Sequence, residues 1–185
     1  MGNVIVIEFV TLDGVVEDPD GSGRTPAGGW AFRHGPEAVA GDKFELGKLL
    51  DTGVMLLGRT TWEAFSKLWP GRTDEFSARM NGIPKLVASR TLTSADAWQN
   101  STVIDGDLVT AVRAEERDVI ITGSLEVVHA LAERDLIDEY RLMVFPVLVG
   151  KGRRLFGDAT PPADLRLVSV QRKGAAALLR YQRER

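Results

Sequence analysis

The sequence predicts a single α/β domain that ends in an antiparallel hairpin. Strand and helix patterns alternate through the middle of the chain, whereas the last third contains only strand patterns. No repeat period and no low-complexity linker divides the chain, so we expect one domain over residues 1–185. Its 185 residues, 44% hydrophobic and 26% charged, are ordinary for a globular domain with one substantial core.

The first third of the chain predicts a strand, a long loop and a helix. Residues 3–11 are β-rich and mostly apolar and lead into the turn at Leu12, Asp13 and Gly14. Residues 15–35 are rich in Gly, Pro and Asp, which is typical of a long loop. A helix is expected from residue 35 to about residue 51, because Pro36 would occupy its first turn.

Residues 53–63 predict a buried strand that runs through Gly58 directly into a helix. The spacing of Thr60 and Glu63 fits a capping box. Trp62, Phe65 and Trp69 form an aromatic stripe at helical spacing, which we expect to lie in the core.

The remaining elements follow in chain order. We expect a helix over residues 73–82, a strand over 84–89, a helix from Asp107 to about 114, a strand over 118–122 and a helix over 124–134. Strands are then expected over residues 139–149, 164–171 and 175–182, with Asp138 and Glu139 as a solvated entry to the first of these.

The strand-to-helix turn at Gly58, Arg59, Thr60 and Thr61 has the features of an anion site. A helix N-terminus offers unpaired N–H groups and the positive end of a dipole, beside an arginine and two hydroxyls. A well-capped helix with an exposed arginine is the alternative. Other strand ends, at Ser89 with Arg90 and at Gly123 with Ser124, would share its edge of the sheet. Arg59 and Arg90 near one anion favour a phosphate monoester, and hence NADPH over NADH.

Four segments, residues 58–63, 84–92, 119–124 and 138–156, resemble the dihydrofolate-reductase-like superfamily in their sequence and order. The chain is most similar to stand-alone relatives of the reductase domain of the bifunctional riboflavin-biosynthesis deaminase-reductase. The resemblance implies a three-layer fold, with helices on both faces of a mixed, mostly parallel sheet and a C-terminal antiparallel hairpin. It also implies a homodimer, for which the apolar strand at residues 139–149 offers a surface.

The resemblance further implies an NADPH-dependent reductase that transfers hydride to a small heterocyclic or carbonyl or imine metabolite, as in 5-amino-6-(ribosylamino)uracil reduction. The cofactor would lie against Gly58, Arg59, Thr60, Thr61, Ser89, Arg90, Gly123 and Ser124. The family's double glycine is Gly123-Ser124 here, and Ser124 is equally consistent with a helix N-cap. A non-catalytic nucleotide- or small-molecule-binding protein of the same fold is the alternative function.

The reacting end of the site has two candidates. Asp13 ends the first strand beside the long loop and could supply a proton, although an Asp-Gly turn gives its carboxylate a local structural role instead. Trp30 could stack on a flat heterocycle or anchor the loop.

Composition excludes several other classes. The chain has no cysteine, and no histidines or carboxylates have metal-ligand spacing, so we expect no disulfide and no metal. A net charge of −3 gives no reason to expect nucleic acid. The N-terminus lacks a targeting pattern and no apolar run reaches membrane-spanning length, so we expect a cytoplasmic protein.

Overall fold

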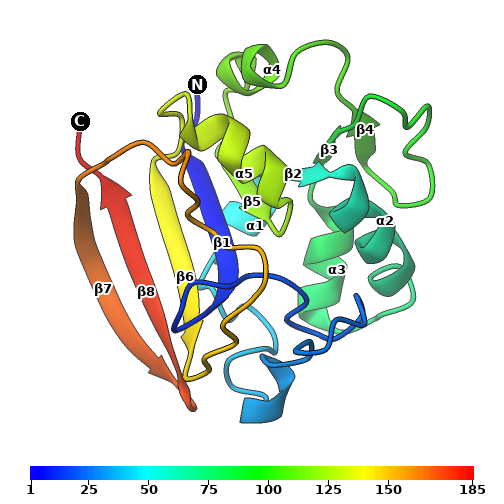
Figure 1. Ribbon diagram of the computed structural model, residues 1–185. Helices are drawn as coiled ribbons and strands as arrows, with labels where there is room; N and C mark the ends of the chain where they lie inside the picture. Colours follow the sequence, from blue (N-terminus) through cyan, green and yellow to red (C-terminus); the bar gives the residue numbers. More distant parts are fainter.

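One mixed sheet organises the protein (Figure 1). The computed structural model describes residues 1–185 and orders eight strands as β4-β3-β2-β5-β1-β6-β8-β7. Pairs from β4 to β6 are parallel, and β8 is antiparallel to both β6 and β7, as predicted. The strands are β1 (Val4–Thr11), β2 (Val54–Gly58), β3 (Lys85–Ala88), β4 (Ser101–Val103), β5 (Val119–Thr122), β6 (Glu139–Phe145), β7 (Leu165–Lys173) and β8 (Ala176–Arg183).

Helices cover both faces of the sheet and complete the three layers. Leu50, Trp62 and Met80 bring α1, α2 and α3 to the core on one face, called the α2 face below. Val112 and Val128 bring α4 and α5 to the core on the other, the α5 face. The helices are α1 (Leu49–Thr52), α2 (Arg59–Leu68), α3 (Glu75–Gly82), α4 (Leu108–Ala114) and α5 (Leu125–Ala132), with a 3-10 turn at Phe32–His34.

Local sequence signals explain the elements that were predicted correctly. Asp74 and Asp107 cap α3 and α4, since their carboxylates accept the N–H groups of Ser77 at 3.0 Å and Thr110 at 2.8 Å. In the aromatic stripe of α2, Trp62 and Trp69 are buried, which confirms it as core.

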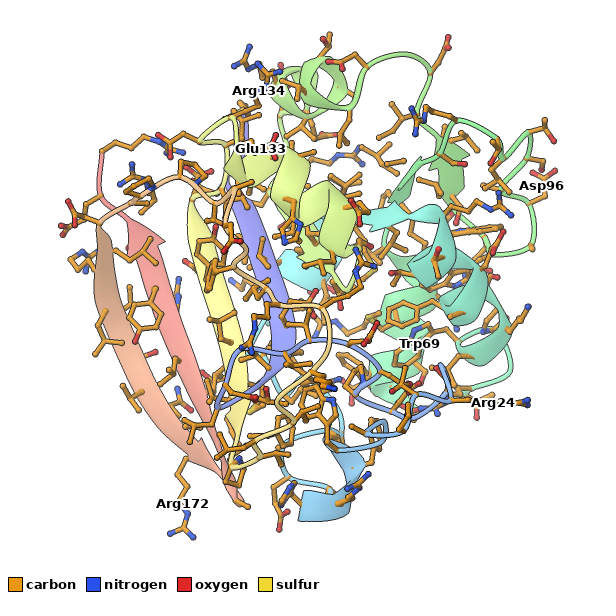
Figure 2. The ribbon with its side chains drawn as sticks, in the orientation of Figure 1. Arg24, Trp69, Asp96, Glu133, Arg134 and Arg172 are labelled. Atoms are coloured by element: carbon orange, nitrogen blue, oxygen red, sulfur yellow. The ribbon has the colours of Figure 1, made fainter.

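The C-terminal hairpin is confirmed and is the least covered part of the sheet. Its turn lies at Gly174, whose φ of 60° suits glycine. Arg172 extends from this end of the hairpin into solvent (Figure 2). The side chains of Leu167 and Val170 on β7 are also exposed.

The helix expected over residues 35–51 was wrong. Gly41, Glu45 and Gly47 have φ values of 58°, 54° and 51°, which a right-handed helix cannot accommodate, so only α1 forms at the end of this stretch. Arg141 of β6 holds the segment by donating to the carbonyl oxygens of Phe44, at 3.0 Å, and Glu45. Distant contacts therefore determine this loop.

The predicted capping box at the start of α2 was also wrong. The helix begins at Arg59, and its N-cap residue Gly58 has no side chain to cap it. Glu63 instead accepts a hydrogen bond from Arg59 Nε at 2.7 Å. The short strand β4 was not predicted, and β6 ends at Phe145, before residue 149. No helix is long and apolar enough to span a membrane.

Candidate functional site

A cavity of about 440 Å³ opens at the carboxyl ends of β2, β5 and β1. The ends of these strands, the first turns of α2 and α5, and the loop after β1 surround it. Its lining includes Glu8, Glu17, Asp18, Gly58, Arg59, Thr60, Thr61, Gly123, Ser124, Glu126 and Arg153.

Sheet order brings the predicted cofactor residues to one edge. Because β2 lies between β3 and β5, the turn after Gly58 stands between the ends of the two neighbouring strands. Gly58 is in register with Ala88, which also lines the cavity and directly precedes Ser89 and Arg90. The three strand ends expected to meet therefore follow one another along the sheet.

The turn at Gly123 and Ser124 is locked to the turn after β2. Both residues have a φ of 54°. Gly58 N–H donates to Ser124 Oγ at 2.9 Å, Ser124 N–H donates to Thr61 Oγ1 at 3.0 Å, and Ser124 Oγ–H donates to the Thr122 carbonyl at 3.0 Å. A Cβ atom on Gly123 would lie 3.0 Å from Thr61 Oγ1, so a larger residue at this position would be crowded as well as strained.

These bonds change the role expected for Ser124. It occupies the N-cap position of α5, but its side chain makes no capping bond. Its hydroxyl proton is directed to Thr122, so Ser124 supports the turn and Thr61 keeps a hydroxyl proton to donate. The N–H groups of Leu125 and Glu126 have no partner within α5, because they belong to its first turn.

The two arginines at this edge differ in how they are held. Arg59 donates from Nε to Glu63 and from Nη1 to Thr91 Oγ1, the latter at 2.7 Å. Its side chain stays half-exposed, while Arg90 is exposed and forms no ion pair. The Ser89 hydroxyl oxygen accepts the N–H groups of Thr91 and Leu92, which shapes the loop that carries Arg90. Arg59 lines the cavity, whereas Ser89 and Arg90 lie outside its lining, next to Ala88.

Glu8 is a cavity residue that sequence reasoning missed. Its side chain is 7% exposed, and burial raises the pKa of its carboxyl group to about 8. No hydrogen bond or ion pair within the protein engages that carboxyl group. The signal in the sequence was a single acidic residue inside the apolar strand from Val4 to Val10.

The geometry gives Asp13 and Trp30 structural roles. Asp13 accepts hydrogen bonds from Thr11 Oγ1 at 2.6 Å and from the N–H groups of Gly150 at 2.7 Å and Val149 at 3.2 Å. The Thr11 and Gly150 bonds lower its pKa to about 2, so Asp13 is an ionised turn anchor and unsuited to supply a proton.

Trp30 is 1% exposed and donates from Nε1 to the Glu17 carbonyl at 2.9 Å. It anchors the loop, packs edge-on against Phe145, and offers no free face for stacking.

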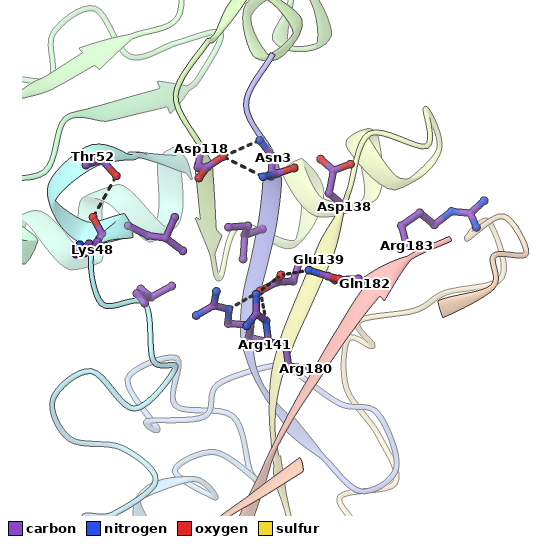
Figure 3. Close-up of a pocket in the computed structure, with 13 residues that line it drawn as sticks. Asn3, Lys48, Thr52, Asp118, Asp138, Glu139, Arg141, Arg180, Gln182 and Arg183 are labelled. Carbon is purple, nitrogen blue, oxygen red and sulfur yellow. Dashed lines mark hydrogen bonds and ion pairs between the residues drawn. The ribbon is translucent and has the colours of Figure 1, made fainter. Parts of the chain in front are cut away.

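A second cavity, of about 560 Å³, lies at the opposite end of β1 and β6 (Figure 3). Glu139 lines it and is 5% exposed, so the predicted solvated strand entry was wrong. Glu139 accepts hydrogen bonds from Arg141, Arg180 and Gln182, as the dashed lines show. Burial raises its pKa, but the bonds from Arg180 and Arg141 outweigh burial and hold the pKa below its usual value. These charges satisfy one another, as in a structural network.

Comparison with known proteins agrees with this fold. Residues 3–179 match the model of the RibD C-terminal domain family. The uncharacterized protein YwjB of Bacillus subtilis (strain 168) is 28% identical over 182 residues, covering 94% of each chain.

Two solved structures share the fold. A putative riboflavin biosynthesis protein from Shewanella sp. PV-4 superposes with a TM-score of 0.76 at 20% identity, over 99% of both chains. RibD from Acinetobacter baumannii superposes with a TM-score of 0.64 at 18% identity, over all of this chain and 59% of its own. The protein therefore has the dihydrofolate-reductase-like fold and belongs to the RibD C-terminal domain family, the reductase-domain family of riboflavin biosynthesis.

Proposed function

We propose that this protein is an NADPH-dependent reductase of a small heterocyclic or carbonyl or imine metabolite. The observation that carries the proposal is the line of donors along one sheet edge, from Arg90 after β3, through Arg59 after β2, to the first turn of α5. A dinucleotide with a 2′-phosphate carries anionic groups at two separate places, so it suits donors that follow one another along an edge. The family to which the chain belongs typically uses a nicotinamide cofactor, which the donors fit.

Each part of this edge suits one part of the dinucleotide. Arg59 and Arg90 would hold the adenosine 2′-phosphate, since guanidinium groups bind phosphate through paired hydrogen bonds. The pyrophosphate would lie at Gly123, where the backbone is free of a Cβ atom, against the N–H groups that begin α5 and the Thr61 hydroxyl. When bound, the reduced nicotinamide supplies a hydride to an electrophilic carbon.

The acceptor would lie on the α2 face, across β1 from Glu8. Phe9 follows Glu8 and therefore points to the opposite face. It stacks on Phe44, with centroids 5.4 Å apart, and meets the exposed Phe32 edge-on at 6.5 Å. The Lys43 ammonium group lies 5.4 Å from the Phe9 centroid, and burial lowers the pKa of Lys43 to about 8. Aromatic walls with one cation suit a flat, electron-rich or anionic heterocycle.

A binder without turnover is the second candidate. The state of Asp13 favours it, because the acid expected from the sequence is ionised and bonded to backbone N–H groups. Lys43 is a group on the acceptor side that could replace Asp13 as a proton source. The two candidates differ in whether a hydride leaves the bound cofactor.

Label transfer separates the reductase from the binder. The protein would be loaded with NADPH that carries deuterium at the hydride position and incubated with a panel of ketones, imines and oxidised pyrimidines or pteridines. Deuterium in a product, with equal loss of reduced nicotinamide, supports the reductase. Tight NADPH binding without transfer to any member of the panel would favour the binder.

A further inference from the structure

Glu8 occupies a place in the site that the dinucleotide motifs do not explain. Strand β5 ends at Thr122, in register with Ile7 of β1. Glu8 is the next residue along β1, so it stands level with Gly123, just beyond the end of β5. It shares the α5 face with Val6 and Val10, because side chains alternate along a strand. Its carboxyl group thus lines the cavity beside the proposed pyrophosphate turn.

The other charged groups around this cavity do not pair with Glu8. Arg59 pairs with Glu63 on α2, and Arg153 pairs with Glu126 of α5. Asp18 is occupied with the backbone N–H groups of Gly23 and Thr25. Glu17 is the remaining charged group in the lining. None of these side chains forms a hydrogen bond or an ion pair with Glu8.

Burial of an unpaired carboxyl group favours its neutral form. Burial raises the pKa of Glu8 to about 8, so near neutral pH its side chain carries a proton and can donate a hydrogen bond. A neutral acid next to a polyanionic ligand causes no repulsion, whereas an ionised one would repel the ligand and lose its donor.

We propose that Glu8 holds the nicotinamide-ribose half of the bound dinucleotide by donating a hydrogen bond as a neutral carboxylic acid, and that ionisation of Glu8 releases the cofactor. This inference rests on the proposed function. The order of the strands indicates which half of the ligand Glu8 would contact. Arg90 comes after β3, Arg59 follows β2 and the pyrophosphate turn follows β5, so the nicotinamide-ribose half would reach β1, the next strand in the sheet. Glu8 is therefore a positioning residue that makes cofactor affinity depend on pH.

The test is the affinity for NADPH as a function of pH in the wild-type protein and in Glu8→Gln. Glutamine keeps the size and a hydrogen-bond donor but cannot ionise. With a pKa of about 8, the wild-type dissociation constant should rise about tenfold between about pH 7 and pH 9, whereas that of Glu8→Gln should stay constant. Glu116→Gln is the control, because Glu116 is an exposed glutamate outside the cavity lining. It should keep the wild-type pH dependence.

The outcomes are distinguishable. Wild-type binding that does not change with pH, or a decline that persists in Glu8→Gln, would overturn the role of Glu8 and leave the reductase proposal standing. A failure of both proteins to bind NADPH at every pH would overturn the proposed function and the role of Glu8 together. Circular dichroism of Glu8→Gln at each pH excludes unfolding as the cause.

Discussion

Gly58 and Ser124 are joined by a hydrogen bond of 2.9 Å, although 66 residues separate them in the chain. The N–H group belongs to the last residue of β2, and the Oγ atom belongs to the residue before α5. This bond ties the two turns that surround the proposed pyrophosphate site. Because Ser124 has a φ of 54°, it also bears backbone strain that a glycine would not.

Replacing Ser124 separates these two effects. Ser124→Ala keeps the strain and removes the hydroxyl, so it should lower the free energy of unfolding by about 1 kcal/mol. Ser124→Gly also removes the hydroxyl but relieves about 1 kcal/mol of left-handed strain, so its stability should stay close to wild type. Urea denaturation of both variants measures the difference. Equal losses of stability would show that strain at this residue is negligible.

Arg59→Ala and Arg90→Ala test the binding of the 2′-phosphate. Each should weaken NADPH by roughly 1.5–3 kcal/mol, because a charged hydrogen bond is lost, and should change NADH affinity little. Arg113→Ala, an exposed arginine on α4 away from the cavity, serves as the control. Fluorescence titration with both cofactors gives the affinities. Equal losses for NADPH and NADH would contradict the assignment.

Glu8 should also make stability depend on pH without any ligand. Its pKa is about 8 in the folded protein against an ordinary 4.5, so folding favours the protonated form. The resulting stability is fully present below about pH 4.5 and is lost as pH rises through 8. The free energy of unfolding of the wild type should thus fall relative to that of Glu8→Gln over this window, by up to about 1.4 kcal/mol per pH unit. Thermal unfolding measures this at each pH. If the midpoint temperatures of the wild type and of Glu8→Gln differ by the same amount from pH 5 to pH 8, the raised pKa is disproved.

Homodimer formation is still a prediction, but we now expect the contact surface on a different strand of the sheet. The apolar strand at residues 139–149 was the expected contact, yet β6 lies between β1 and β8 and has no free edge. The exposed Leu167 and Val170 on the edge strand β7 are better placed. Light scattering should give a dimer mass for the wild type.

Val170→Lys places a charge on this surface and should prevent dimer formation, so light scattering should give the mass of a monomer. Gln171→Lys, at the next position and on the opposite face of the strand, should remain dimeric. A wild-type monomer would reject the proposal.

Sequence patterns predicted the elements that local signals determine. The helix that begins after Asp107 and the C-terminal hairpin are specified within a few residues, and both were found. The turns after β2 and β5 were also expected to meet, because parallel strands share one carboxyl edge, and they line one cavity, whereas Ser89 and Arg90 lie outside its lining.

The errors arose where distant residues decide the structure. The segment before α1 follows a loop held by Arg141, and its positive φ values at Gly41, Glu45 and Gly47 leave no helix. Glu139 is charged but buried, because Arg180 and Arg141 from the same sheet face surround it. Glu8 was overlooked although it is the single acidic residue in an apolar strand, because that pattern indicates a buried acid but not the cavity that it lines.

The direct measurement of the central claim is a titration of the purified protein with NADPH and with NADH, followed by quenching of its tryptophan fluorescence. The donors at Arg59, Arg90 and the α5 turn predict saturable binding that is at least tenfold tighter for NADPH, since one charged phosphate contact contributes about 1.5–3 kcal/mol. Absence of binding to either cofactor, or equal affinity for both, would contradict the claim.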